Sequence, residues 1–174
     1  MKKFLLVLTL VFSLVLSACA SGEDLQGKFG TPSVVTMTLS SSSPSGSRSV
    51  GASDDFLVFD MKASTTKTLA VGTKFQIALA ADADIDTASA AGLKVYLKKK
   101  GTTIGEGTLS VVDGSLVEGT LELTSELKLS TTSTELTLNT NTSLLLAEDA
   151  GVDDPLTATL TYGTTSVTGN TVNY

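Results

Sequence analysis

The chain has 174 residues, of which 41% are apolar, and this is enough for one domain with a hydrophobic core. It is acidic, with 18 Asp and Glu against 12 Lys and Arg, which argues against nucleic acid as a partner because polyanions are held by clustered cations. It has no His and a single Cys. Composition therefore excludes catalysis by His, the commonest metal ligand and any intramolecular disulfide.

The first 18 residues have the layout of an export signal. Lys2 and Lys3 are followed by a mostly apolar run over residues 4–16. As a helix this run would be about 20 Å long, whereas the hydrocarbon core of a bilayer is about 30 Å thick. Because it is too short for a comfortable permanent span, we predict a signal peptide over residues 1–18.

The residues Leu16, Ser17, Ala18 and Cys19 resemble the bacterial lipobox. In proteins with this motif the Cys is diacylated on sulfur before the signal peptidase cuts on its amino side, so the resemblance implies a lipid anchor on Cys19. Two or three acyl chains hold a protein durably at a membrane. The next residue is Ala20 rather than Asp. By resemblance to the sorting of enterobacterial lipoproteins, this favours the outer membrane in a two-membrane cell. A one-membrane cell would display the protein outside. The alternative is an ordinary secretory signal with a Cys near its end by chance.

Beyond the leader, the pattern of the chain is that of β-structure. Residues 19–32 are polar, contain Gly and show no hydrophobic period, so we predict a flexible tether there. From residue 33 to residue 174, short runs rich in Val, Leu, Ile and Thr recur between turn residues, and no helical period is sustained. We predict one all-β domain over residues 33–174. Its strands are expected at 34–41, 56–63, 68–71 running toward 74–80, 93–99, 102–112, 116–123, 127–130, 135–139, 156–162 and 166–172.

Several of these runs alternate strictly between apolar and polar residues. Leu93, Val95 and Leu97 share one face of their strand, and Lys94 and Lys98 lie on the other. The same alternation occurs over residues 136–138 and 156–161. Strands with one buried and one wet face are predicted to stack as a two-sheet antiparallel β-sandwich.

Turn residues separate the predicted strands. Lys100-Gly101, Asp113-Gly114 and Tyr162-Gly163 are typical of tight turns, and the lysines at 98–100 are interpreted as a hairpin tip that keeps a strand end soluble. The stretch SSSSPSGS at 40–47 is predicted to be a flexible loop. Residues 62–69 resemble residues 128–136, which two equivalent strand–turn–strand corners explain as well as a duplication does.

The order of four segments is similar to the immunoglobulin-like β-sandwich modules of large bacterial surface proteins. The segments are FLVFDMKA (56–63), LKVYL (93–97), GEGT (105–108) and LKLSTTSTELTL (127–138), and the likeness covers about residues 55–172. Such modules serve as spacers or coat components in tandem arrays, and they have no catalytic residues. The resemblance implies an immunoglobulin-like fold and a structural or adhesive role.

One acidic loop is a candidate metal site. Asp82, Asp84 and Asp86 alternate along a predicted loop, and carboxylate oxygens are the ligands that Ca²⁺ prefers. The Gly and bidentate Glu of the helical calcium-loop template are not matched. We therefore predict a calcium site built from sandwich loops, with a solvated acidic loop as the alternative. A neighbouring loop offers further acids, namely Glu148, Asp149, Asp153 and Asp154.

No residue pattern supports catalysis. Ser is abundant but has no His to act as its base, and the Ser-x-x-Lys matches Ser64/Lys67 and Ser125/Lys128 begin no predicted helix. A carboxylate hydrolase would need two buried acids facing one cleft. We predict that the protein is not an enzyme.

Together these patterns predict a non-enzymatic lipoprotein of the cell envelope that displays a structural or adhesive β-sandwich module. The alternative is a calcium-dependent or carbohydrate-binding surface lipoprotein. The expected partners are membrane lipid, through acylated Cys19, and envelope proteins or surface glycans. The expected location is the outer membrane or the outer face of the cell membrane, and Ca²⁺ is the one cofactor that the sequence suggests.

Overall fold

The computed structural model describes residues 32–47, 54–81, 92–113, 116–140 and 155–173. Contacts divide the chain into two compact units, Met1–Ser33 and Val34–Tyr174, and all the strands belong to the second. The strands are β1 (Val35–Leu39), β2 (Gly46–Ser47), β3 (Asp54–Ala63), β4 (Lys67–Leu69), β5 (Lys74–Ala81), β6 (Lys94–Lys99), β7 (Thr102–Asp113), β8 (Leu116–Leu123), β9 (Leu127–Leu129), β10 (Thr134–Thr140), β11 (Pro155–Tyr162), β12 (Thr165–Thr168) and β13 (Val172–Asn173). The described part of the chain is therefore all-β, as the alternating pattern predicts.

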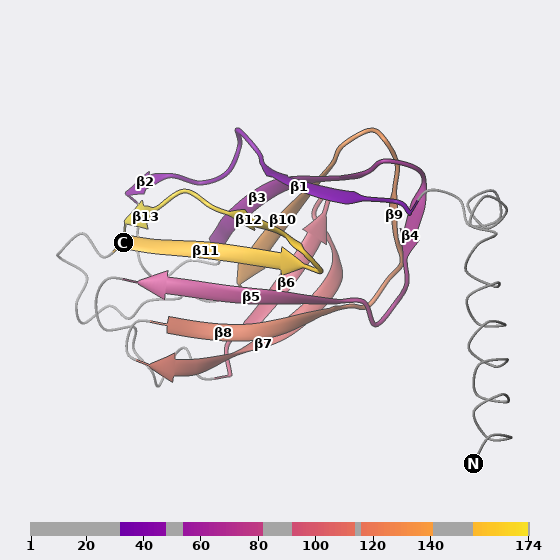
Figure 1. Cartoon of the computed structure of the whole chain (residues 1–174). Helices are drawn as coiled ribbons and strands as arrows, with labels where there is room; N and C mark the ends of the chain where they lie inside the picture. The colour runs from indigo at the N-terminus through magenta and orange to yellow at the C-terminus, as the bar shows by residue number, and fades with distance from the viewer. Residues whose placement is uncertain (1–31, 48–53, 82–91, 114–115, 141–154, 174) are drawn as a thin grey trace, which may run out of the picture. The chain divides into compact units, whose positions relative to one another are not determined.

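Most strands join one hydrogen-bonded sheet. Its order is β1-β3-β10-β6-β7-β8-β5-β11-β13-β2, with β12 pairing to β11 (Figure 1). The pairs along this path are antiparallel except for β13 and β2, which run parallel. The sheet curls on itself, so Met37 of β1, at one end of the path, and Val167 of β12, which pairs with β11 near the other end, belong to the same buried core.

This continuous sheet differs from the two separate sheets that the sequence pattern predicts. The hairpin β6–β7 hydrogen-bonds one half of the sheet to the other, from Lys94 with Thr108 to Lys99 with Thr102. A second, two-stranded sheet is formed by β4 and β9. The expectation of an all-β domain is thus correct, and the hydrogen-bonded order of the strands is what the alternating pattern does not predict. The reason is that strand alternation reports which face is buried and not which strand is the neighbour.

Two glycines allow the sheet to bend at β7 and β8. A Cβ atom on Gly107 would lie 2.5 Å from the backbone oxygen of Thr120, and one on Gly119 would lie 2.6 Å from that of Thr108. No side chain fits at such distances, so glycine is required for the close approach of the two backbones. Glycine inside a strand is typical of tight bends at the corners of closed sheets.

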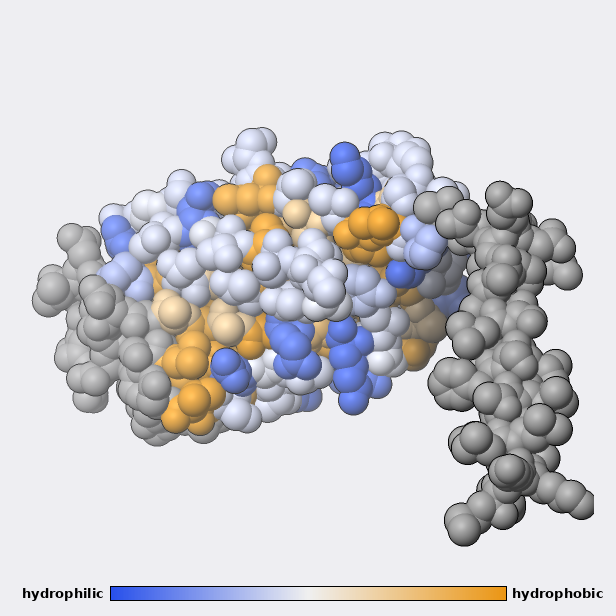
Figure 2. Space-filling view, viewed as in Figure 1, coloured by the Kyte–Doolittle hydropathy of each residue, from blue (hydrophilic) through white to orange (hydrophobic). Residues whose placement is uncertain are grey.

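The core follows the predicted faces. Val95 and Leu97 of β6 are fully buried, whereas Lys94 is exposed. Leu136 and Leu138 of β10 are also fully buried. The outer surface is mainly polar, with apolar areas that are separate from one another in the view of Figure 2. The outer face of β6 is therefore wet at Lys94, as expected, whereas in β10 Asn139 is buried beside the predicted core residues.

The two similar segments of the sequence lie side by side. The chain passes from β3 into β4 through one of them and from β9 into β10 through the other. Because β3 pairs with β10 and β4 pairs with β9, both antiparallel, the two strand–turn–strand corners face each other. The backbone N–H of Ala63 donates to the oxygen of Ser130 at 2.8 Å and joins the two corners.

The stretch 40–47, predicted to be a flexible loop, has buried contacts. Ser40 and Ser43 are buried, and Gly46–Ser47 forms β2. The backbone N–H of Val58 donates to the hydroxyl of Ser43 at 3.1 Å, and the N–H of Ser40 donates to the backbone oxygen of Val58 at 3.1 Å. Serine hydroxyls can complete a sheet in this way, and composition alone does not reveal it.

The last predicted strand, 166–172, is divided. β12 ends at Thr168 and β13 begins at Val172, and between them the N–H of Gly169 donates to the backbone oxygen of Ala158 at 2.8 Å. Both pieces pair with β11. The break therefore leaves the position of this segment beside β11 unchanged.

None of the described residues forms a helix long and apolar enough to cross a membrane.

Candidate functional surface

The residues of the predicted lipid anchor and calcium site lie outside the described ranges. Cys19 is one of them, and Asp82, Asp84 and Asp86 are the others. The lipid anchor and the calcium site therefore stay predictions. Within the described ranges, no group of three or more His, Cys, Asp or Glu side chains lies together as a metal site would require. The further acids of the neighbouring loop, Glu148, Asp149, Asp153 and Asp154, also lie outside these ranges.

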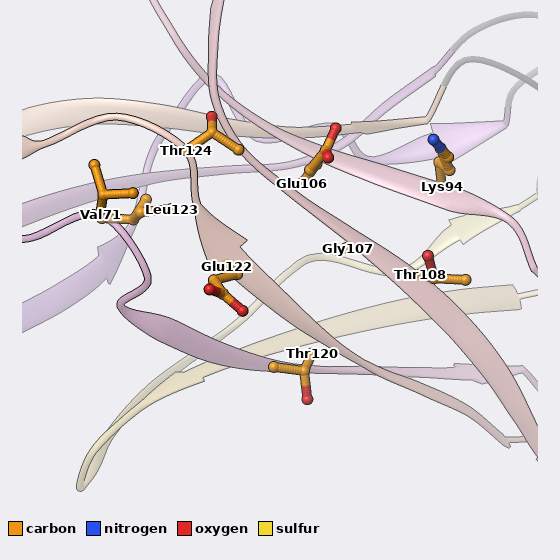
Figure 3. Close-up of a pocket in the computed structure, with 9 residues that line it drawn as sticks. All are labelled: Val71, Lys94, Glu106, Gly107, Thr108, Thr120, Glu122, Leu123 and Thr124. Carbon is orange, nitrogen blue, oxygen red and sulfur yellow. The ribbon is translucent and has the colours of Figure 1, made fainter.

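A groove runs over the outer face of β6, β7 and β8, and we call it the β7–β8 groove (Figure 3). Its volume is about 710 Å³. Most of the side chains that line it come from strands that are neighbours in the sheet, and Gly107 adds no side chain to it. The lining residues are Val71, Lys94, Glu106, Gly107, Thr108, Thr120, Glu122, Leu123 and Thr124.

The register of the sheet orders the polar groups of the groove. Glu106 of β7 lies directly opposite Glu122 of β8, and Thr108 lies opposite Thr120. Like charges directly opposite each other on a sheet are destabilising. Lys74 of β5 lies on the other side of Glu122 and places a positive charge in the same row. The groove therefore presents carboxylates, hydroxyls and, at Lys94, an ammonium group.

These groups suit binding better than catalysis. Glu106 and Glu122 are both exposed to solvent. A carboxylate hydrolase would need two acids in different surroundings, because a difference in burial is what separates the roles of acid and base. The groove is instead a wet surface that can accept and donate hydrogen bonds.

A second hollow lies at the β6–β7 hairpin tip, and we call it the hairpin-tip pocket. Its volume is about 490 Å³, and it lies between the tip and the start of β10. The local sequence at the tip indicates a solubilising turn, and it does not reveal the pocket because nothing in it shows that β10 is the neighbour of β6. The lining residues are Lys99, Lys100, Gly101, Ser133, Thr134, Glu135 and Thr137.

The Ser-x-x-Lys match at Ser64 and Lys67 has a structural role. The hydroxyl of Ser64 accepts a hydrogen bond from the backbone N–H of Val34 at 2.9 Å. The ammonium of Lys67 lies 5.7 Å from the centre of the Tyr162 ring, within the range of a cation–π contact. The ring of Tyr162 in turn packs on Phe75, with 5.2 Å between the ring centres. The side chains of Ser64 and Lys67 therefore make structural contacts near the ends of strands.

No protein-family model matches the chain. No curated protein matches it either.

Three solved structures are distantly similar to the chain. The sixth cohesin of scaffoldin B from Acetivibrio cellulolyticus, solved with a mutant dockerin, is 13% identical over 80% of this chain and 97% of its own, with a TM-score of 0.30. A DUF4466 family protein from Parabacteroides merdae is 12% identical over 82% of this chain, but the match spans 42% of that protein, with a TM-score of 0.29. The collagen-binding subdomain ACE19 of the Enterococcus faecalis surface protein ACE is 6% identical over 84% of this chain and 99% of its own, with a TM-score of 0.31. None of these likenesses is close enough to assign the chain to a family.

Proposed function

We propose that the protein is a non-enzymatic lipoprotein of the bacterial cell envelope whose β-domain serves as a structural or adhesive module. The observation that carries the proposal is the position of Cys19. It is the sole Cys of the chain, and it follows Leu16, Ser17 and Ala18 at the end of an apolar segment that is too short to span a bilayer comfortably.

The described domain supports the second half of the proposal. Its outer strand faces are polar, and the β7–β8 groove is lined by exposed carboxylates and hydroxyls. Such a surface can make many hydrogen bonds with a protein or a glycan, and it holds no activated nucleophile. We also propose that this module has an immunoglobulin-like fold.

The anchor is tested by metabolic labelling with a fatty acid in a bacterial host. The wild-type chain is expected to take up the label and to sediment with membranes. The variant Cys19→Ser is expected to take up none. Equal labelling of the two chains would contradict lipidation at Cys19, since no other residue of the chain offers a thiol.

The adhesive role is tested with the second compact unit, Val34–Tyr174, produced on its own, because it has neither an acyl chain nor an apolar leader to carry it into membranes. It is expected to bind washed envelopes from cells that lack the protein. Thr120→Arg, which fills the β7–β8 groove, is expected to weaken that binding, whereas Thr36→Arg on the exposed face of β1 is the matched control. Binding that is absent, or that is unchanged by Thr120→Arg, would contradict adhesion through the groove.

A further inference from the structure

The β6–β7 hairpin tip concentrates positive charge on an acidic protein. Three lysines are consecutive at residues 98–100, whereas the whole chain carries a net charge of −6. Lys100 has a positive φ of 50° and Gly101 one of 80°, while Lys99 pairs with Thr102 across the turn. Positive φ at both central residues is the geometry of a type I′ turn, in which Asn or Gly is the usual first residue.

Lysine is an unfavourable choice for that position. A non-glycine residue in the left-handed region costs about 1 kcal/mol or more, and Asn tolerates it better than a residue with a long side chain. Lys100 therefore places an ammonium group at the tip, although its positive φ is unfavourable for a lysine.

The neighbouring charges are already partnered. The ammonium of Lys98 donates to Oδ1 of Asn139 at 2.8 Å, and Nδ2 of Asn139 donates to Oδ1 of Asp55 at 2.6 Å. Glu135, the acid among the residues that line the hairpin-tip pocket, has its Oε2 atom occupied by two donors: the hydroxyls of Ser40 at 3.1 Å and of Ser42 at 3.0 Å.

Two cations of the pocket remain. Among the described residues, neither Lys99 nor Lys100 has a hydrogen bond or an ion pair for its ammonium group. The hydroxyls of Ser133, Thr134 and Thr137 line the same pocket and can act as donors. Two lysines and three hydroxyl-bearing residues around one pocket are a suitable set for a phosphate group, which offers several strong acceptor oxygens.

From these contacts we propose that the hairpin-tip pocket binds a phosphate-bearing group. The group comes either from the headgroup of an anionic lipid or from free phosphate. At about 490 Å³ the pocket has room for the phosphate and for part of the molecule that carries it. This inference is independent of the function proposed above, because it rests on the contacts of the tip and on neither Cys19 nor the β7–β8 groove.

The test is lysine footprinting of the full chain. The chain is labelled with an amine-acylating reagent, and the modification of each lysine is measured by mass spectrometry. In neutral detergent micelles the probe is inorganic phosphate, with chloride at equal ionic strength as the control. In vesicles, phosphatidylglycerol is compared with phosphatidylcholine. Lys128 is exposed on β9, away from the pocket lining, and serves as the internal reference.

A several-fold fall in the labelling of Lys99 and Lys100, with Lys128 unchanged, is the expected result. Protection by inorganic phosphate assigns free phosphate as the ligand. Protection in phosphatidylglycerol vesicles alone assigns a lipid headgroup. If neither arm protects the two lysines selectively, the proposal is overturned.

A variant separates binding from folding. Lys100→Asn removes one cation and places a residue that favours positive φ, so its unfolding midpoint is expected to equal or exceed that of the wild type. Its Lys99 is expected to lose protection by the probe. Unchanged protection of Lys99 in this variant would show that Lys100 is not part of a phosphate site.

Discussion

Val95 and Lys94 are consecutive residues with opposite surroundings. Val95 is fully buried on the inner face of β6, and Lys94 is exposed on the outer face. Val95→Asp would bury a carboxylate without a partner, and we expect it to lower the free energy of unfolding by at least about 3 kcal/mol. Most small domains have about 5 to 15 kcal/mol in total, so the variant is expected to be largely unfolded or strongly destabilised.

Lys94→Asp is the matched control at the next residue. It introduces the same side chain on the wet face, where a change of less than about 1 kcal/mol is expected. Both variants are compared with the wild type by urea unfolding followed by circular dichroism. Equal tolerance of the two substitutions would contradict the assignment of the faces of β6.

Among the elements, the connection between β1 and β2 depends on one serine. The backbone N–H of Val58, in β3, donates a buried hydrogen bond to the hydroxyl of Ser43. Ser43→Ala would leave this N–H without an acceptor, at a cost of about 1–3 kcal/mol. The expected result is a lower urea midpoint with an unchanged slope.

Ser45 provides the comparison within the same stretch. It is exposed, and Ser45→Ala is expected to change stability by less than about 0.5 kcal/mol. If Ser43→Ala and Ser45→Ala have the same midpoint, the hydroxyl of Ser43 does not complete the hydrogen bonding of β3.

For the domain as a whole, the close approach of β7 and β8 in the middle of the sheet depends on glycine. Gly107→Ala would place a Cβ 2.5 Å from the oxygen of Thr120 and 2.9 Å from the Cα of Leu121, both of which are backbone atoms. Because backbone cannot move aside as a flexible side chain can, β7 and β8 would have to separate. We expect a loss of about 2 kcal/mol or more, measured by thermal unfolding.

Thr108→Ala is the control in the same strand, since Thr108 is exposed on the outer face. Removing its β-branched side chain is expected to cost less than about 1 kcal/mol. If Gly107→Ala is as stable as Thr108→Ala, the close approach of the β7 and β8 backbones does not require glycine at residue 107.

The all-β class, the approximate limits of most strands and the buried faces of β6, β10 and β11 could be predicted from the sequence. So could the turn at Lys100-Gly101. These are local properties, because side chains alternate along a single strand and because turns depend on the backbone freedom of one or two residues.

Which strands distant in the sequence are neighbours emerged only from the three-dimensional structure. Ser42 and Glu135 are 93 positions apart, yet their side chains share a hydrogen bond, and Glu135 lines the hairpin-tip pocket together with Lys99 and Lys100. In the same way, the need for glycine at Gly107 arises from the backbone of Thr120 on another strand. No periodicity within either segment encodes these contacts, because they depend on how distant strands pair and on the sharp bend of the sheet that brings its ends together.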